Sequence, residues 1–467
     1  MDYLPLSLNA AAGRPLYQQL YDFLVAEITS GRAAAGERLP AKRSLAANLG
    51  VSLNTVETAL GMLAAEGYVE ARPRSGCYVA DIAPLLPPVR PLAAAAAPTP
   101  AAAPAPAYDF STSGVDTALF PFKTWSRIAR GVLAADPGLL NHGPAEGDAE
   151  LRGAIAGYLH EFRGVHCSAQ QIVVGAGMEY LLGLLAHLLP GPVALEQPGY
   201  PKARQIFANS GLATVPVPVD AEGLDVAALA RSGAATVYVT PSHQFPTGAL
   251  MPAARRTALL RWAAAGQRVV IEDDYDSEFR FDGRPVPSLQ SLDTAGRVVY
   301  VGTFSRSIAP GIRIGYLVLP APLLARYRSV FAGYSCTVSR LEQQTLARFL
   351  TDGHFTRCLN RARGVYRARR DALTAALAGA FGGTLTLCGA HTGLHLVAAP
   401  GLPLTEAELV AHAAAAGVRV TGLSRYGAPP AFLPGPAVVL GYATLDTAAV
   451  GAAARRLAGA WGAGPAA

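Results

Sequence analysis

An alanine- and proline-rich segment, residues 82–107, divides this chain of 467 residues into two parts. The segment contains eight prolines and a single charged residue, Arg90. Because proline lacks a backbone N–H and fixes φ, this density of proline blocks both helix and sheet. We therefore expect a semi-rigid linker between two folded domains, residues 14–81 and residues 108–467.

The rest of the composition argues against several classes of protein. Residues 1–3 lack the basic and apolar regions of a secretory signal, and the richest apolar stretch, residues 181–189, is too short to span a bilayer. The five cysteines are scattered, odd in number and without C-x-x-C spacing, which argues against a metal site and against a disulfide framework. We expect a cytoplasmic protein with no membrane partner and no bound metal.

The formal net charge of +6 is not concentrated in the N-terminal part. Residues 1–81 contain seven lysine or arginine residues and eight aspartate or glutamate residues. The basic excess lies further along the chain, in a group of arginines at helical spacings: Arg357, Arg361, Arg363, Arg367, Arg369 and Arg370. This spacing favours a solvated or inter-subunit helix face over a surface that binds DNA.

Residues 14–81 have the pattern of three helices followed by a two-stranded wing. The first helix is predicted from four apolar residues spaced four apart: Leu16, Leu20, Leu24 and Ile28. A second helix is predicted over residues 42–49, and Ser52 is a good N-cap for a third. Short strands are expected at residues 68–71 and 77–80. Together these elements predict a winged helix-turn-helix.

Residues 108–467 alternate short apolar runs with helical patterns, which predicts an α/β domain. The strands are expected at residues 192–195, 236–240, 268–271, 298–301 and 314–319. Apolar runs of this kind, separated by helices, imply parallel strands that are buried on both faces.

The N-terminal part resembles the GntR family of DNA-binding proteins. The resemblance rests on Pro-Leu-Tyr-Gln-Gln-Leu at 15–20, Gly-Glu-Arg-Leu-Pro at 36–40 and Leu-Gly-Val-Ser-Leu-Asn-Thr-Val at 49–56. It implies that the third helix enters the major groove of double-stranded DNA while the wing meets the backbone or the minor groove. A winged helix used only for protein contacts is the alternative.

The same resemblance implies which residues contact DNA: Lys42, Arg43, Ser52, Asn54, Thr55, Arg72, Arg74 and Gly76. The four basic residues are expected to form one patch, and the polar residues of the third helix are expected to approach phosphates or base edges. Two positions depart from the family. Leu53 stands where an arginine or another polar residue is usual, and Ala41 replaces the Ser/Thr cap of the second helix at a cost of about 1 kcal/mol.

Several segments of the C-terminal part resemble the fold-type-I aminotransferases, which use pyridoxal phosphate (PLP). They are residues 175–180, 196–200, 240–248, 272–275 and 300–316. Together with the winged helix, their order resembles the MocR/GabR-type regulators. The resemblance implies the PLP-dependent transferase fold of type I, with a large mixed, mostly parallel sheet sandwiched by helices and a small α+β domain. It also implies a homodimer that responds to a small-molecule effector.

The implied cofactor-binding residues are Gly177, Tyr200, Asp273, Tyr275, Ser305, Arg306 and Arg313. In this assignment Asp273 pairs with the pyridine nitrogen, which strengthens the electron-sink character of the ring. Strand alternation makes Asp273 face opposite to Glu272 and Asp274. An acidic cluster that binds a divalent metal is the alternative use of residues 272–274.

Arg306 stands where the family has the lysine that forms a Schiff base with PLP. A guanidinium stays protonated and offers no free amine, so it cannot form that bond. It can instead hydrogen-bond a phosphate or a carboxylate through two N–H groups. Val439 also stands near the position where many aminotransferases carry an arginine for the substrate carboxylate.

The sequence therefore predicts a DNA-binding transcriptional regulator whose aminotransferase-like domain holds PLP or a related anion without a covalent bond and has no catalytic residue. Two alternatives stay open. The domain is an active PLP-dependent aminotransferase with an appended DNA-binding module, or it is a decayed site that serves as a dimerisation scaffold.

Overall fold

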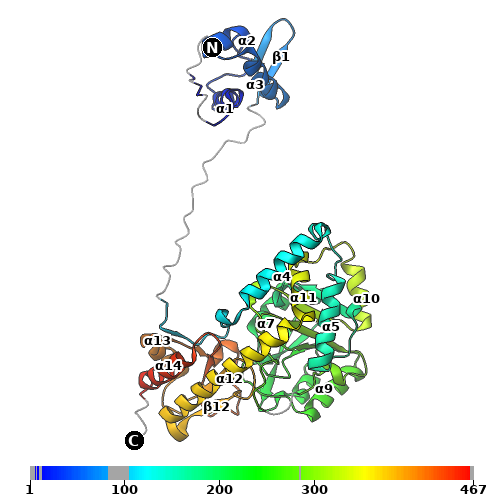
Figure 1. Cartoon of the computed structure of the whole chain (residues 1–467), viewed down its shortest axis with the longest axis vertical. Helices are drawn as coiled ribbons and strands as arrows, with labels where there is room; N and C mark the ends of the chain where they lie inside the picture. Colours follow the sequence, from blue (N-terminus) through cyan, green and yellow to red (C-terminus); the bar gives the residue numbers. More distant parts are fainter. Residues whose placement is uncertain (1–5, 7, 10–12, 83–104, 283–285, 463–467) are drawn as a thin grey trace. The chain divides into compact units, whose positions relative to one another are not determined.

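The computed structural model describes the whole chain except residues 1–5, 7, 10–12, 83–104, 283–285 and 463–467 (Figure 1). The chain divides into two compact units between Ala103 and Pro104. Most of the predicted linker, residues 82–107, lies outside the described residues.

The N-terminal unit contains three helices and a two-stranded antiparallel sheet (Figure 1). The elements are α1 (Leu16–Thr29), α2 (Lys42–Leu49), α3 (Leu53–Ala65), β1 (Val69–Arg72) and β2 (Gly76–Val79). Leu20, Leu24 and Leu63 are fully buried in its core. The three predicted helices are confirmed, and each strand is displaced by about one residue from its predicted range.

The turn between α2 and α3 is set by the residues that end one helix and begin the next. Gly50 ends α2 in the left-handed conformation with a φ of 65°, which glycine adopts without steric cost. The Ser52 hydroxyl accepts a hydrogen bond from the Thr55 N–H at 3.2 Å and so caps α3. Ala41 makes no side-chain cap for α2, as the sequence predicted.

The C-terminal unit is built on an eight-stranded sheet with the order β4-β11-β10-β9-β8-β5-β6-β7. The strands are β4 (Ile172–Gly175), β5 (Val193–Gln197), β6 (Thr214–Asp220), β7 (Gly223–Leu224), β8 (Thr236–Val239), β9 (Val269–Asp273), β10 (Val298–Thr303) and β11 (Gly315–Val318). The five strands from β10 to β6 in this order are parallel. Strand β11 is antiparallel to both of its neighbours.

The parallel direction expected for the strand at residues 314–319 was therefore wrong. A parallel crossover needs a dozen or more residues, usually a helix, between the two strands. Only a short loop with the single 3-10 turn Pro310–Ile312 joins β10 to β11, so the chain returns in the opposite direction.

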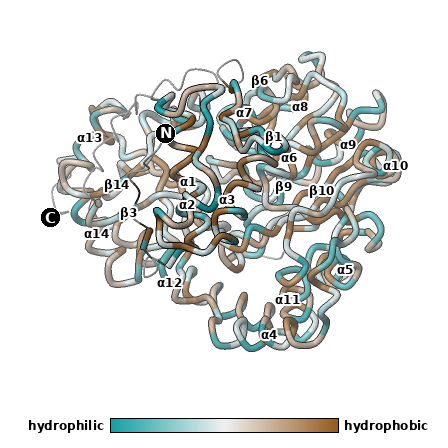
Figure 2. The backbone as a smooth tube through the Cα atoms, turned by 90° about the horizontal axis from the view of Figure 1, so that it is seen from above, coloured by the Kyte–Doolittle hydropathy of each residue, from teal (hydrophilic) through white to brown (hydrophobic). Residues whose placement is uncertain are grey.

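Helices cover both faces of the large sheet (Figure 1). They include α5 (Ala149–Arg163), α6 (Met178–Ala186), α7 (Pro201–Asn209), α8 (Val226–Arg231), α9 (Ala253–Ala265), α10 (Ala321–Val330) and α11 (Arg340–Thr351), and α4 (Phe122–Ala135) packs against α11. Strand β10 is apolar along most of its length (Figure 2). Val299 and Val301 pack in one core cluster and Tyr300 packs in another, so both faces are buried.

A smaller four-stranded antiparallel sheet has the order β12-β13-β16-β15. Its strands are β12 (Thr386–Cys388), β13 (His395–Ala399), β15 (Thr421–Gly422) and β16 (Val438–Gly441), and it is accompanied by α13 (Glu406–Ala415) and α14 (Thr447–Ala460). Near the start of the unit, β3 (Tyr108–Asp109) pairs in parallel with β14 (Val418–Arg419). Among the described residues, no helix is long and apolar enough to cross a membrane.

The long helix α12 (His354–Phe381) connects the large sheet to the smaller one. The sequence predicted a solvated or inter-subunit face for its arginines, but Arg369 and Arg370 are buried. Arg369 donates to the Ala443 carbonyl at 2.6 Å, and Arg370 donates to the Ala390 carbonyl at 2.8 Å. These side chains fix the helix to the small domain, because backbone carbonyls supply the acceptors that water would otherwise provide.

Candidate functional site

The candidate site lies at the carboxyl ends of the central parallel strands, where ligands bind in open α/β sheets. Asp273 is the last residue of β9, and Arg306 follows β10. Tyr200 precedes α7 at its N-terminus. Burial raises the pKa of the Tyr200 phenol; Asp273 raises it further, whereas Arg306 and Arg313 lower it. These four residues come from three segments of the chain, 196–200, 272–275 and 300–316, and lie close enough for their charges to interact.

The two carboxylate oxygens of Asp273 are in different situations. Oδ2 accepts a short hydrogen bond from the Tyr238 hydroxyl. Oδ1 is buried and has no hydrogen-bond partner among the described residues. Burial raises the pKa of this carboxyl to about 7. A buried carboxylate oxygen without a donor fits a cationic N–H, such as the protonated pyridine nitrogen of PLP.

The two neighbouring acids have other partners. Glu272 accepts backbone hydrogen bonds from Leu289 at 2.6 Å and from Gln290 at 2.8 Å. Asp274 forms a buried ion pair with Arg163 at 2.7 Å. The predicted difference in facing between Asp273 and its neighbours agrees with these contacts. Since each carboxylate has separate partners, the arrangement does not favour the acidic metal cluster that was the alternative.

Gly177 and Arg313 meet at the N-terminus of α6. Gly177 has a φ of 88°, and a Cβ on it would lie 2.8 Å from Nη2 of Arg313. That nitrogen donates to the Ala176 carbonyl at 3.0 Å and to Oε2 of Glu179 at 2.7 Å. The Gly177 N–H itself donates to the Gly175 carbonyl at 2.7 Å, so an anion at this helix N-terminus would meet the N–H groups of the residues that follow Gly177.

Glu179 is a residue that the sequence analysis did not identify. Lys202 binds its other oxygen at 2.7 Å, so one carboxylate holds two cations. Hydrogen bonds from Arg313 and Lys202 lower the pKa of Glu179 to about 2. An acidic residue in the first turn of a helix is common and gave no signal. Any anion that binds Arg313 competes with Glu179.

Ser305 and Thr303 form a local turn after β10. The Thr303 hydroxyl donates to the Ser305 hydroxyl at 2.9 Å, and the Ser305 N–H donates to Thr303 Oγ1 at 3.2 Å. Both residues lie within three positions of Arg306, at the carboxyl end of β10.

The half-buried Arg306 makes one hydrogen bond to a described residue. Its Nη1 donates to the Gly114 carbonyl at 3.2 Å. A guanidinium has five N–H donors, so most of its capacity is left for another acceptor. The nearby amine of Lys202, the one lysine that could replace the missing Schiff-base residue, is held in the ion pair with Glu179.

Tyr275 contacts a buried histidine rather than open space. Its hydroxyl lies 3.0 Å from Nδ1 of His243 and donates to the His243 carbonyl at 3.1 Å. His243 also contacts Asp276 at 3.0 Å and packs beside His395. Among the described residues, His243, Asp276 and His395 have potential metal-ligand atoms within 4.8 Å of one another. No metal was expected from the sequence, and this group carries no local motif because its members lie far apart in the chain.

An aromatic wall and an apolar cluster complete the site. The Phe245 ring contacts Tyr200 and Tyr426 edge-on, with centroid distances of 6.1 and 5.0 Å. Tyr426 packs against the cluster that contains the fully buried Val439. Position 439 therefore supplies no cation to this wall.

In the N-terminal unit, two of the four predicted DNA-contacting cations are paired with acids. Lys42 lies 3.2 Å from Glu57, and Arg72 lies 3.3 Å from Glu70. Arg72 also stacks over the Tyr78 ring. The other two, Arg43 and Arg74, are exposed and have no hydrogen bond or ion pair with a described residue.

The polar residues of α3 lie at its start, as expected for a recognition helix. Asn54 is exposed, and the hydroxyls of Ser52 and Thr55 contact each other at 2.8 Å. Leu53, with 39 % of its surface exposed, lies among them. Gly76 begins β2 of the wing with a φ of 114°.

Comparisons with known proteins match both parts of the chain. The family model of aminotransferases of class I and II matches residues 114–457, and that of bacterial regulatory proteins of the gntR family matches residues 16–79. The HTH-type transcriptional regulator YdeL of Bacillus subtilis, which is uncharacterized, is 39% identical over 471 residues, covering 99% of this chain and 100% of YdeL. The probable rhizopine catabolism regulatory protein MocR of Rhizobium meliloti is 35% identical, covering 94% of this chain and 92% of MocR.

The fold of the C-terminal unit is also found among solved structures. An archaeal alanine:glyoxylate aminotransferase superposes with a TM-score of 0.69 at 24% identity. The match covers 76% of this chain and 90% of that protein. The C-terminal unit therefore has the fold of type-I PLP-dependent transferases, with a large mixed, mostly parallel sheet, as the sequence predicted.

Proposed function

Because the chain belongs to the MocR-type transcriptional regulators, which join a GntR winged helix to an aminotransferase class I and II domain, we propose that it is controlled by PLP or a related anion held without a covalent bond. The proposal rests on the arginine at position 306, which stands where the family has the lysine whose amine binds PLP covalently. The effector domain is then a receptor rather than an enzyme.

The residues at the site fit PLP. Asp273 would pair its free Oδ1 with the pyridine nitrogen, and Tyr200 would lie against the ring. Ser305, Arg313 and the backbone N–H groups that follow Gly177 would hold the phosphate. When bound, PLP supplies an electron sink. Arg306 offers no amine to use it, and the Lys202 amine is held by Glu179, so we expect no transaminase turnover with ordinary amino acids.

Arg306 also offers a route from the ligand to the rest of the domain. Its hydrogen bond to Gly114 ties the site to the segment that follows the linker. An anion bound to Arg306 would compete for the same guanidinium and loosen that segment. We propose that this change alters how two winged helices engage two half-sites of an operator in a cytoplasmic homodimer.

Calorimetric titration of the full-length protein with PLP, combined with footprinting on a mapped promoter, tests the proposal. We expect saturable binding and a footprint that changes with PLP. The variant Arg306→Gln should bind PLP about tenfold or more weakly, because it loses a charge-assisted contact. The matched variant Arg348→Gln changes an exposed arginine of α11 and should behave as the wild type. Absence of PLP binding to the folded protein would support the scaffold alternative.

A further inference from the structure

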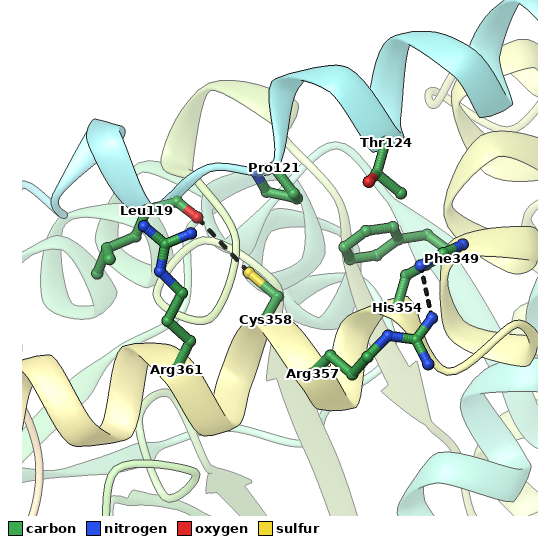
Figure 3. Close-up of a pocket in the computed structure, with 8 residues that line it drawn as sticks. All are labelled: Leu119, Pro121, Thr124, Phe349, His354, Arg357, Cys358 and Arg361. Atoms are coloured by element: carbon green, nitrogen blue, oxygen red, sulfur yellow. Dashed lines mark hydrogen bonds between the residues drawn. The ribbon is translucent and has the colours of Figure 1, made fainter.

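A pocket lies between the start of α4 and the first turns of α12 (Figure 3). Its lining shares no residue with the candidate cofactor site around Tyr200, Asp273 and Arg306, which is called the cup below. The volume of the pocket is about 190 Å³. Apolar groups of Leu119, Pro121 and Phe349 line it, together with three basic residues, His354, Arg357 and Arg361. A cavity of roughly 150 Å³ holds a benzene molecule, so this pocket has room for a small organic acid.

The basic residues stand at two ends of the pocket. Figure 3 shows Arg361 near Leu119, while His354 and Arg357 lie together near Phe349. Arg357 and Arg361 are one helical turn apart, which separates their Cα atoms by about 6 Å along α12. The lining thus has a positive group at each end and an apolar surface between them.

These basic side chains lack acidic partners. Among the described residues, no carboxylate lies within ion-pair distance of His354, Arg357 or Arg361, and Arg361 has no hydrogen bond at all. The two ring nitrogens of His354 face guanidinium groups, Nδ1 at 2.7 Å from Arg357 and Nε2 at 3.5 Å from Arg127. A neutral imidazole accepts at only one nitrogen, so one of these two N–H groups finds no acceptor.

The basic residues also lie in the first turns of α12, where the helix end itself is positive. The first turn of α12 contains no acidic residue, although the N-terminal end of a helix is positive and disfavours nearby cations. An anion in the pocket would compensate both the basic side chains and the helix end.

We propose that this pocket binds a small dicarboxylate, with one carboxylate at Arg361, the other at His354 and Arg357, and a short methylene chain over Leu119, Pro121 and Phe349. Bidentate guanidinium–carboxylate contacts would fix the two ends, and the apolar floor would select the chain length. The site is independent of the cup and of the function proposed for it.

Titration of the full-length protein with glutarate, and with valerate as the matched monocarboxylate, tests the proposal. We expect glutarate to bind about tenfold or more tightly than valerate, since a charge-assisted contact contributes roughly that factor. The variant Arg361→Gln should lose the preference for glutarate and leave valerate binding unchanged. Glutarate binding should persist in Arg306→Gln, which alters the cup, and in Arg348→Gln, which alters an exposed arginine outside the pocket.

Three outcomes would overturn the proposal. They are equal affinities for the two acids, loss of glutarate binding in Arg306→Gln, and a change of oligomeric state in Arg361→Gln. The last would assign the arginine to a contact between copies of the chain. If Arg361→Gln fails to fold, as circular dichroism would show, Arg357→Gln provides the same comparison at the other end of the pocket.

Discussion

The hydroxyl of Tyr238 donates to Oδ2 of Asp273, whereas Oδ1 of the same carboxylate is buried without a donor. Tyr238 is the penultimate residue of β8 and Asp273 ends the neighbouring parallel strand β9, so the phenol reaches the carboxylate from the adjacent strand. The free oxygen is left for a ligand. Oδ1 is therefore a defined acceptor for a cationic N–H of a ligand, and substitutions of Asp273 test whether the site binds one.

Asp273→Asn should reduce the pH dependence of stability. Burial raises the pKa of Asp273 to about 7, so between about pH 4 and pH 7 the folded state retains a proton that the unfolded state has lost. The free energy of unfolding therefore falls as the pH rises through this window, by an amount on the order of 4 kcal/mol. Denaturant unfolding between pH 4.5 and 7.5 checks this.

The same experiment has an internal comparison. Glu196 and Glu278, whose pKa values burial also raises to about 7, remain in the variant, so its slope should be reduced rather than abolished. Asp352→Asn, which changes an exposed aspartate outside the site, is the matched control for the slope of unfolding free energy against pH. Equal slopes for Asp273→Asn and wild type would show that Asp273 does not titrate in this range.

Gly177→Ala should weaken PLP binding by about tenfold or more while the domain remains folded. The φ of 88° disfavours alanine, and the new Cβ would lie 2.8 Å from Arg313 Nη2, so the guanidinium must move. Gly183→Ala is the matched control, because a Cβ there meets nothing within 4 Å. If Gly177→Ala binds PLP as tightly as the wild type does, the phosphate of PLP does not bind at Gly177.

Much of the N-terminal unit could be predicted from sequence because its signals are local. The spacing of Leu20 and Leu24 and the cap at Ser52 fix helices without reference to distant residues. The direction of β11 could not be derived in this way, since it depends on the absence of a crossover helix before Gly315.

The site followed the same rule. Asp273 and Arg306 were assigned to one site because their segments resemble the family, and the structure has Asp273 at the end of β9 and Arg306 just after the neighbouring parallel strand β10. The pairing of Glu179 with Arg313, and of Tyr275 with His243, joins residues from separate segments that carry no motif for each other. The burial of Arg369 was missed because its acceptor is a backbone carbonyl, which has no sequence signature.

Arg43→Ala and Arg74→Ala should weaken binding to every DNA sequence and flatten its salt dependence. Both side chains are exposed without an acidic partner, so each is available to a phosphate. Each substitution should lower the slope of log K against log salt by about 1. Arg14→Ala, which removes an exposed cation paired with Asp22, is the control. Unaltered binding of both variants to a mapped promoter site would mean that the assigned DNA face is wrong.

Leu53→Arg should strengthen DNA binding at low salt by several-fold. Leu53 is exposed at the start of α3, among the residues expected to approach DNA, and it contributes no charge. A guanidinium there would add one phosphate or base contact and steepen the salt dependence. Leu53→Gln separates the effect of charge from that of size. If Leu53→Arg binds as the wild type does, the start of α3 does not face DNA.

The most direct test of a receptor without covalent chemistry is mass spectrometry after borohydride reduction in saturating PLP, with absorbance recorded beforehand. The wild type should bind PLP in equilibrium dialysis yet gain no mass. The variant Arg306→Lys should turn yellow, lose that absorbance on reduction and gain a covalent mass on residue 306. A wild-type adduct on Lys202 would contradict non-covalent binding. A colourless Arg306→Lys that is folded and dimeric in excess PLP would contradict the ligand site itself.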